Sequence, residues 1–261
     1  MDLGLKGRTA LVLGAGGGLG SVIAATLAAE GANVALADMD AQALAVTAQT
    51  IRSHGGRAIQ QVWDLSDVSS IDVRIRAIED EFGAIDVLIN NTGGPPPTPA
   101  AGQSAELWAK SFQAMVLSVI QISDRVLPSM RERRWGRIVT STSSGVLSPI
   151  PNLGISNALR LTLVGWSKTL AREIAPDGVT ANIVVPGRIA TARIAFLDQA
   201  KAKREGRTVA EVSAESTGSI PMRRYGTPQE YANAVAFLAS DAASYITGSV
   251  VRVDGGLIAS I

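Results

Sequence analysis

Short runs of apolar, mostly β-branched residues alternate along this chain with longer stretches in which apolar residues recur every three or four positions. The short runs predict strands and the longer stretches predict amphipathic helices. The predicted strands are 8–13, 33–37, 58–62, 86–90, 137–142, 180–185 and 250–253. The predicted helices are 18–30, 41–53, 67–82, 104–130, 153–175 and 228–239.

The alternation of strands and helices predicts an α/β fold. Runs such as ALVL and VLIN are nearly continuously apolar, which is typical of parallel strands buried on both faces. Right-handed crossovers then give a doubly wound, Rossmann-like sheet whose ligand crevice lies at the carboxyl ends of the strands. No linker or repeat divides the 261 residues, so we expect a single domain over 1–261. Segments 93–103 and 187–226 follow strand ends, and we expect both to be irregular and to overhang the crevice.

Composition narrows the possible partners. The 24 basic and 23 acidic side chains leave a net charge of +1, which does not favour nucleic acid or an anionic membrane surface. There are no cysteines, and no cluster of histidines and acids has the spacing of a metal site. The N-terminus lacks the order of a signal peptide, and no apolar run is long enough to span a bilayer. We therefore expect a cytoplasmic protein that acts on a small molecule.

A glycine-rich turn joins the first predicted strand to the first predicted helix. The sequence there is Gly14-Ala15-Gly16-Gly17-Gly18-Leu19-Gly20. Glycine lets the backbone turn tightly and approach a diphosphate, which is then held by the amides at the start of the helix. An acid, Asp38, ends the second predicted strand. A carboxylate there accepts hydrogen bonds from an adenosine ribose and repels a 2′-phosphate, so the pattern predicts a dinucleotide site that favours NAD over NADP.

The spacing Gly14-x-x-x-Gly18-x-Gly20 resembles that of the short-chain dehydrogenases/reductases, and the chain looks most similar to the bacterial 3-oxoacyl-carrier-protein reductases. Several other stretches agree in order, and the resemblance covers essentially the whole chain. It implies an adenine contact at Asp64 and Leu65 and backbone contacts to the cofactor at Asn91 and Gly93. It also implies nicotinamide contacts at Pro186, Gly187 and Thr191.

The resemblance also implies a catalytic tetrad, and here the chain departs from the family. In the family a tyrosine transfers a proton, a lysine four residues later lowers its pKa, a serine orients the substrate and an asparagine holds a relay water. Alignment through 137–139 and 167–171 retains the serine as Ser143. The alignment gives Met115 at the asparagine, Ile155 at the tyrosine and Leu159 at the lysine.

No shift of the alignment restores the phenol, because none of the three tyrosines falls between the fifth and sixth predicted strands. Arg160 adjoins the lysine position, but one residue is about 100° around a helix, so we expect it to point away from the cofactor. Isoleucine and leucine instead predict an apolar pocket and slow carbonyl chemistry. Other candidates for the proton donor are Arg188, Arg193, Tyr225 and a water held by Ser143.

Three hypotheses remain open at this point. The protein is an NAD-dependent oxidoreductase with an unusual proton donor, a dinucleotide-binding sensor, partner or scaffold without turnover, or a cofactor-free binding or non-redox protein that uses an apolar pocket. The resemblance further implies a homo-oligomer, either a tetramer or a dimer, that pairs helices 104–130 and 153–175 and uses the C-terminal strand.

Overall fold

Seven parallel strands form one sheet at the centre of the molecule. The computed structural model describes residues 2–261. The strand order is β3-β2-β1-β4-β5-β6-β7, all parallel. The bounds are β1 Thr9–Leu13, β2 Asn33–Asp38, β3 Arg57–Val62, β4 Val87–Asn90, β5 Gly136–Ser141, β6 Val179–Pro186 and β7 Val250–Val253. The predicted doubly wound α/β fold is confirmed, and each predicted strand is present to within one residue at either end.

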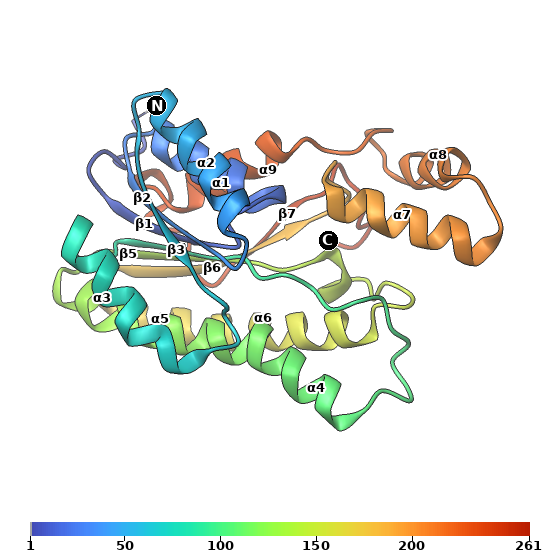
Figure 1. Ribbon diagram of the computed structural model, residues 1–261, viewed down its shortest axis with the longest axis horizontal. Helices are drawn as coiled ribbons and strands as arrows, with labels where there is room; N and C mark the ends of the chain where they lie inside the picture. The colour runs from blue at the N-terminus through green and yellow to red at the C-terminus, as the bar shows by residue number, and fades with distance from the viewer. Residues whose placement is uncertain (1) are drawn as a thin grey trace.

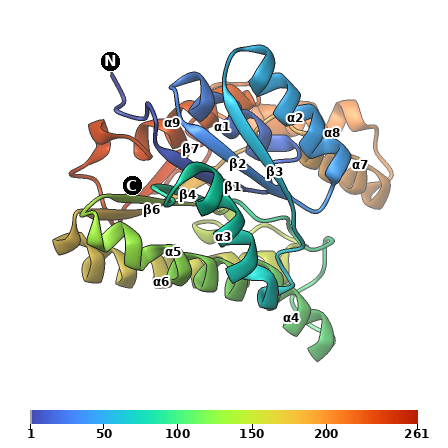
Figure 2. The same cartoon turned by 60° about the vertical axis from the view of Figure 1, so that its left-hand side comes forward.

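Helices cover both faces of this sheet (Figure 1, Figure 2). One face carries α1 (Gly18–Ala29), α2 (Ala41–Ser53) and α9 (Pro228–Leu238). The other face carries α3 (Ile71–Phe82), α5 (Ser118–Glu132) and α6 (Gly154–Ile174). Strand β1 shows why both layers form: Ala10 and Val12 pack into the first layer, whereas Leu11 and Leu13 pack into the second. Because successive side chains alternate across a strand, a fully apolar strand needs cover on both sides.

The predicted continuous helix over 104–130 is interrupted. Helix α4 (Ala105–Phe112) passes into a π turn, η2 (Gln113–Leu117), before α5 begins. A π turn adds one residue to the helical ring, and such turns occur frequently at functional sites. The 3.6-residue periodicity of apolar positions in the sequence does not reveal so short a π turn.

The expectation that 187–226 is irregular is wrong, because this segment contains α7 (Ala192–Glu205) and α8 (Val209–Ser219). Both helices project from the end of the sheet (Figure 1). Thr208 and Glu211 form a capping box that starts α8, and Gly206 ends α7 with φ +64°. The base of the excursion is closed by a β-bridge between Ile189 and Gly226.

The other overhanging segment, 93–103, has no helix or strand and lies against the start of α6. The Gly154 amide donates to the Thr98 carbonyl (2.9 Å), and Thr98 also forms a β-bridge with Leu153. A side chain at Gly154 would clash with the backbone of Ala100. This close contact fixes where α6 begins.

No helix within residues 2–261 combines the length and the apolar character that crossing a membrane requires.

Candidate functional site

The turn after β1 is built around two glycines that tolerate no side chain. Gly14 has φ +64°, and a Cβ there would lie 2.5 Å from the Asn91 carbonyl oxygen. A Cβ on Gly20 would lie 2.0 Å from the Gly14 carbonyl oxygen. The turn therefore packs backbone against backbone, and it brings the end of β1 close to the loop that follows β4.

The start of α1 leaves its amides free. Gly17 occupies the N-cap position and supplies no side-chain acceptor, so nothing in the side chains of this turn satisfies the first helical N–H groups. Gly17, Gly18 and Leu19 all line a cavity. Free amides at the positive end of a helix dipole suit a phosphate, and glycines without Cβ atoms let it approach.

Asp38 stands at the end of β2, beside this turn. Its Oδ2 accepts a hydrogen bond from the Gly16 amide (3.0 Å) and its Oδ1 accepts one from the Asp40 amide (3.1 Å). These two bonds hold the carboxylate against the glycine turn while it still lines the cavity. An acceptor fixed in this place suits a ribose with two free hydroxyls.

The cavity that these residues line has a volume of about 470 Å³. It lies at the carboxyl ends of the strands, where β1 and β4 are neighbours although β2 and β3 intervene in sequence. This is the place at which doubly wound sheets bind ligands. Thr92 and Thr142 lie in its wall, and the hydroxyl of each is buried without a hydrogen-bond partner within residues 2–261.

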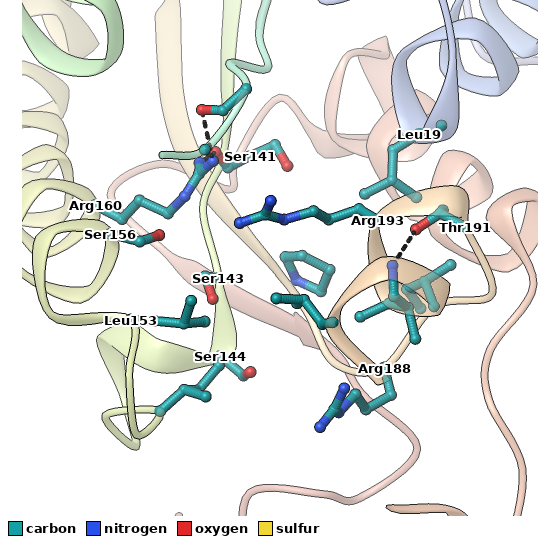
Figure 3. A pocket seen from close by; sticks show the side chains of 18 of the residues that line it. Leu19, Ser141, Ser143, Ser144, Leu153, Ser156, Arg160, Arg188, Thr191 and Arg193 are labelled. Carbon is teal, nitrogen blue, oxygen red and sulfur yellow. Dashed lines mark hydrogen bonds between the residues drawn. The ribbon is translucent and has the colours of Figure 1, made fainter. Parts of the chain in front are cut away.

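Ser143, Ser156 and Arg160 line the end of the cavity beyond the glycine turn (Figure 3). Ser143 follows β5, and its Oγ accepts from the Gly145 amide (3.1 Å). The Arg160 guanidinium donates to the carbonyl oxygens of Ser141 (3.3 Å), Thr92 (3.0 Å) and Gly93 (3.2 Å). Burial lowers the pKa of Arg160 to about 10, which still leaves the guanidinium charged at neutral pH.

The expectation that Arg160 points away from the crevice is therefore wrong. Helix α6 turns the residues at 156 and 160 toward the cavity and those at 155 and 159 toward the core. Ile155 is fully buried and Leu159 is 6% exposed, and neither lines the cavity. Both pack with Met115 in an apolar cluster that joins α6 to the π turn.

This arrangement also removes the basis for an apolar pocket formed by Ile155 and Leu159. Since residues four apart share one face of a helix, Ser156 and Arg160 form one pair and Ile155 and Leu159 form another. A shift of one residue along the helix therefore exchanges the pair that faces the cavity with the pair that faces the core. The sequence-based expectation assigned the core pair to the cavity wall.

Most of the predicted cofactor residues do lie together around the cavity. These are Gly14, Gly18, Leu19, Asp38, Asn91, Gly93, Pro186, Gly187 and Thr191. Three others do not line it. Gly20 supports the turn from behind, Asp64 accepts hydrogen bonds from the amide and hydroxyl of Ser66, and Leu65 packs against the core.

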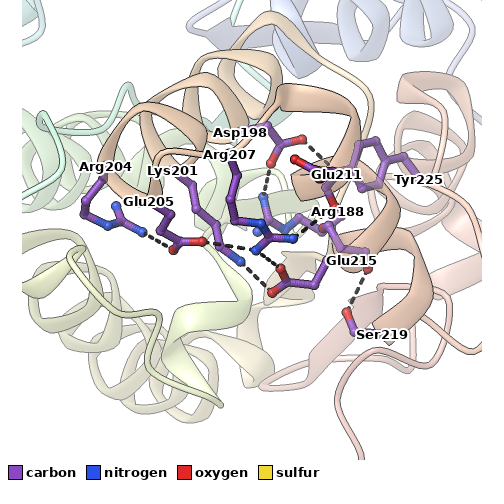
Figure 4. Close-up of polar contacts among 11 residues, drawn as sticks. Arg188, Asp198, Lys201, Arg204, Glu205, Arg207, Glu211, Glu215, Ser219 and Tyr225 are labelled. Atoms are coloured by element: carbon purple, nitrogen blue, oxygen red, sulfur yellow. Dashed lines mark hydrogen bonds and ion pairs between the residues drawn. The ribbon is translucent and has the colours of Figure 1, made fainter.

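Helix α7 forms one wall of the cavity and is held by ionic contacts (Figure 4). Its residues at 193, 194, 197, 200, 201 and 204 line the cavity, with the spacing of one helix face. Asp198, which does not line the cavity, accepts from Arg188 (3.1 Å) and from the Tyr225 hydroxyl (2.7 Å). Tyr225 therefore braces α7 and does not reach the cavity wall.

A second set of contacts ties α7 to α8. Glu215 accepts from Lys201 (2.7 Å) and from Arg207, and these two cations lower the pKa of its exposed carboxyl to about 2. Arg204 pairs with Glu205 (3.1 Å). The two helices of the excursion are thus joined to each other through charges at their surface.

The family profile described as enoyl-(acyl carrier protein) reductase matches residues 14–258. The chain belongs to the short-chain dehydrogenase/reductase family. The 3-oxoacyl-[acyl-carrier-protein] reductase FabG of Escherichia coli (strain K12) is 37% identical over 260 residues, which cover 98% of this chain and 99% of the relative. This short-chain dehydrogenase/reductase is thus related to the bacterial 3-oxoacyl-carrier-protein reductases, as its motifs imply.

Solved structures of other family members superpose closely. The L-sorbose reductase of Gluconobacter frateurii, complexed with NADPH and L-sorbose, has a TM-score of 0.94 and 28% identity, with 100% of both chains covered. An NAD⁺-bound xylitol dehydrogenase has a TM-score of 0.90 and 28% identity, with 97% of this chain and 99% of that chain covered. Similar proteins therefore bind nicotinamide dinucleotides of both kinds.

The residues that sequence reasoning missed at this site are Ser156 and Arg160. A signal for them was present, because they have the same four-residue spacing as a tyrosine and a lysine on one helix face and both are polar, whereas Ile155 and Leu159 are not. A pair on the cavity side of a helix is more often polar than a pair on the core side. That contrast could have selected the correct face.

Proposed function

We propose that this protein is an oxidoreductase that binds NAD(H) along the cavity and exchanges hydride with a small carbonyl or alcohol substrate. The observation that carries the proposal is one continuous cavity that runs from the free amides of α1 and the fixed Asp38 carboxylate to Ser143, Ser156 and Arg160. Hydride exchange with a substrate carbon is the chemistry that the nicotinamide supplies when bound. The residues of this chain bind the cofactor, orient the substrate and stabilise charge that develops during hydride transfer.

Asp38 supports the preference for NAD over NADP. Its carboxylate is held beside the glycine turn by two backbone amides and lines the cavity. It can accept hydrogen bonds from both ribose hydroxyls, whereas a 2′-phosphate would place like charges close together. Met39, the next residue, is exposed and offers no cation to such a phosphate.

We further propose that Ser156 and Arg160 occupy the positions of the family's tyrosine and lysine. Both face the cavity, and they are separated by the four residues that the family motif requires. The Arg160 guanidinium retains the positive charge of the lysine, so it can stabilise negative charge that develops on a substrate oxygen. Ser143 keeps the position of the serine that orients the substrate.

A serine at position 156 does not replace the acidity of a phenol. A serine hydroxyl is a much weaker acid than a phenol, so we propose that the proton comes from a water held by Ser143 and Ser156 or from the substrate itself. Loss of a positioned acid reduces the rate by about 10²- to 10⁴-fold. The protein should therefore reduce ordinary ketones slowly.

A second function is supported by one observation. Among residues 2–261 none of the three tyrosines, Tyr225, Tyr231 and Tyr245, lines the cavity. The protein could then bind a dinucleotide without turning it over and act as a sensor, partner subunit or scaffold. Binding alone does not separate the two functions, but turnover does.

The experiment has two stages. Calorimetry first measures the affinity for NAD(H) and NADP(H), and failure to bind either nucleotide would refute both functions. Oxidation of NADH is then measured with ketones, aldehydes and acyl thioesters. Slow turnover above buffer supports the oxidoreductase, whereas binding without any turnover supports the sensor.

A double variant tests the assignment of the two positions. Ser156→Tyr with Arg160→Lys should increase ketone reduction, because it supplies a phenol and an ammonium at the cavity wall. Ser156→Phe with Arg160→Lys is the matched control, since it has the same ring without the hydroxyl. Equal rates for the two double variants would contradict the assignment.

We also propose that the protein forms a homo-oligomer. Strand β7 lies at the edge of the sheet, and Phe112 on α4 and Leu161 on α6 are 40% and 52% exposed. An unpaired strand edge and exposed large apolar side chains both favour contact with another copy of the chain. Light scattering should give a mass of two or four chains, and a monomer at micromolar concentration would contradict this.

A further inference from the structure

Some of the positive charges that line the cavity have a carboxylate partner, and others do not. In the part of the chain that the structure describes, five cationic side chains line it, and three of them have a carboxylate partner: Arg188 pairs with Asp198, Lys201 with Glu215, and Arg204 with Glu205. Arg160 and Arg193 have none within residues 2–261. The acid that lines the cavity, Asp38, is held at the glycine turn.

These two unpaired guanidinium groups lie close to each other (Figure 3). Arg160 comes from α6 and Arg193 comes from α7. Both flank Gly94, because a Cβ on that glycine would lie 3.4 Å from the Arg193 Nη2 and 3.8 Å from the Arg160 Nη2. The two side chains thus hold like charges close to a single backbone position.

Every hydrogen bond that these two guanidinium groups donate goes to a carbonyl oxygen. Arg160 donates to the carbonyls of Ser141, Thr92 and Gly93, and Arg193 donates to the Pro95 carbonyl (3.0 Å). A guanidinium has five N–H donors, so donors remain on each side chain. Two neighbouring like charges without a counter-ion, one of them nearly fully buried, are costly unless an anion joins them.

We propose that Arg160 and Arg193 together bind an oxyanion carried by the substrate, so that the protein acts on small carbonyl compounds bearing a carboxylate or a phosphate. This inference rests on the proposed function, because it places the anion beside Ser143 and Ser156, where the carbonyl would react. A guanidinium matches the two oxygens of a carboxylate or phosphate with two parallel hydrogen bonds. The first cation comes from α6 and the second from α7, so α7 contributes directly to the choice of substrate.

Two pairs of ketones separate the anion from the carbonyl. Acetoacetate is compared with its neutral methyl ester, and dihydroxyacetone phosphate is compared with dihydroxyacetone. Calorimetry measures binding of each compound to the protein with and without NAD. Preference for acetoacetate identifies a carboxylate site, and preference for dihydroxyacetone phosphate identifies a phosphate site.

Arg193→Gln should weaken binding of the preferred anion about 10- to 100-fold, since hydrogen bonds to charged groups are being lost. The neutral partner compound should bind unchanged. Lys203→Gln is the matched control, because it removes one positive charge from the same helix at an exposed position that does not line the cavity. Equal affinity for the charged and neutral compounds, or an unchanged affinity for the anion in Arg193→Gln, would overturn the proposal.

The outcomes also distinguish this inference from the proposed function. Selective anion binding in a protein that binds no dinucleotide would leave the anion site standing and refute the oxidoreductase. Dinucleotide binding without any preference for the charged compounds would refute the anion site and leave the oxidoreductase standing.

Discussion

The two faces of α6 give opposite predictions for the same substitution at neighbouring positions. Leu159→Lys places an ammonium in the apolar cluster with Met115 and Ile155, where the wild-type side chain is 6% exposed. Arg160→Lys places it among the carbonyl oxygens of Ser141, Thr92 and Gly93. The first ammonium has no partner, whereas the second has three acceptors nearby.

The size of the difference follows from the cost of burying the charge. Burial depresses the pKa of a lysine by up to 3–5 units from about 10.4, and each unit is worth about 1.4 kcal/mol. A depression of about 3 units makes Leu159→Lys less stable by about 4 kcal/mol at pH 7, which lowers Tm by about 8–16 °C. Arg160→Lys keeps its charge and loses one or two hydrogen bonds, at a cost of about 1–2 kcal/mol.

The pH dependence provides a second readout. A lysine whose pKa is depressed in the folded state must lose a proton on folding, so the unfolded state binds more protons and stability rises with pH. The Tm deficit of Leu159→Lys should therefore shrink between pH 7 and pH 9.5, approaching the unfolded pKa of about 10.4. Differential scanning calorimetry at both pH values measures this. If Leu159→Lys is as stable as Arg160→Lys and its deficit does not change with pH, then position 159 faces the cavity and our assignment is wrong.

Two further substitutions test the cofactor site, and a third tests a buried hydrogen bond beside it. Gly17→Ala should leave Tm unchanged, because a Cβ there meets no protein atom within 4 Å and the backbone φ is −174°. It should weaken NAD binding, because the new methyl group enters the cavity. An unchanged affinity for NAD by calorimetry would contradict a phosphate at this turn. Asp38→Ala should weaken NAD binding and strengthen NADP binding, about 10-fold each, and parallel losses for both nucleotides would count against the ribose contact. Tyr231→Phe removes a buried hydrogen bond to the Ser141 hydroxyl (2.8 Å) and should lower the free energy of unfolding by about 1–3 kcal/mol, measured by urea denaturation; a loss below 0.5 kcal/mol would show that this bond contributes little.

The sequence predicted the sheet well because parallel strands have a strong signal. A strand covered on both faces is buried at every position and nearly all apolar, as β1 and β4 are. The glycine turn and Asp38 were equally readable, since their chemistry depends on backbone geometry and on position after a strand. These features are local in the sequence.

The features that were missed depend on contacts between distant segments. Helix α7 has many polar residues and is stabilised by Asp198, which binds Arg188 and Tyr225 across the excursion. The orientation of α6 depends on its packing against the π turn and on the contact of Gly154 with segment 93–103. The sequence-based expectation put Ile155 and Leu159 in the cavity wall, which the structure forms from Ser156 and Arg160, and periodicity alone could not distinguish the two faces.

The bridge between Ile189 and Gly226 has a consequence for how this chain can change. The Ala190 amide donates to the Gly226 carbonyl (2.8 Å), and the Gly226 amide donates to the Arg188 carbonyl (2.9 Å). The 36 residues between Ile189 and Gly226 leave and re-enter the fold at adjacent points, and the cost of closing such a loop rises only slowly with its length. A change in the length of this segment beyond Thr191 therefore need not move the strands or the glycine turn, although it would rebuild the cavity wall that α7 now forms.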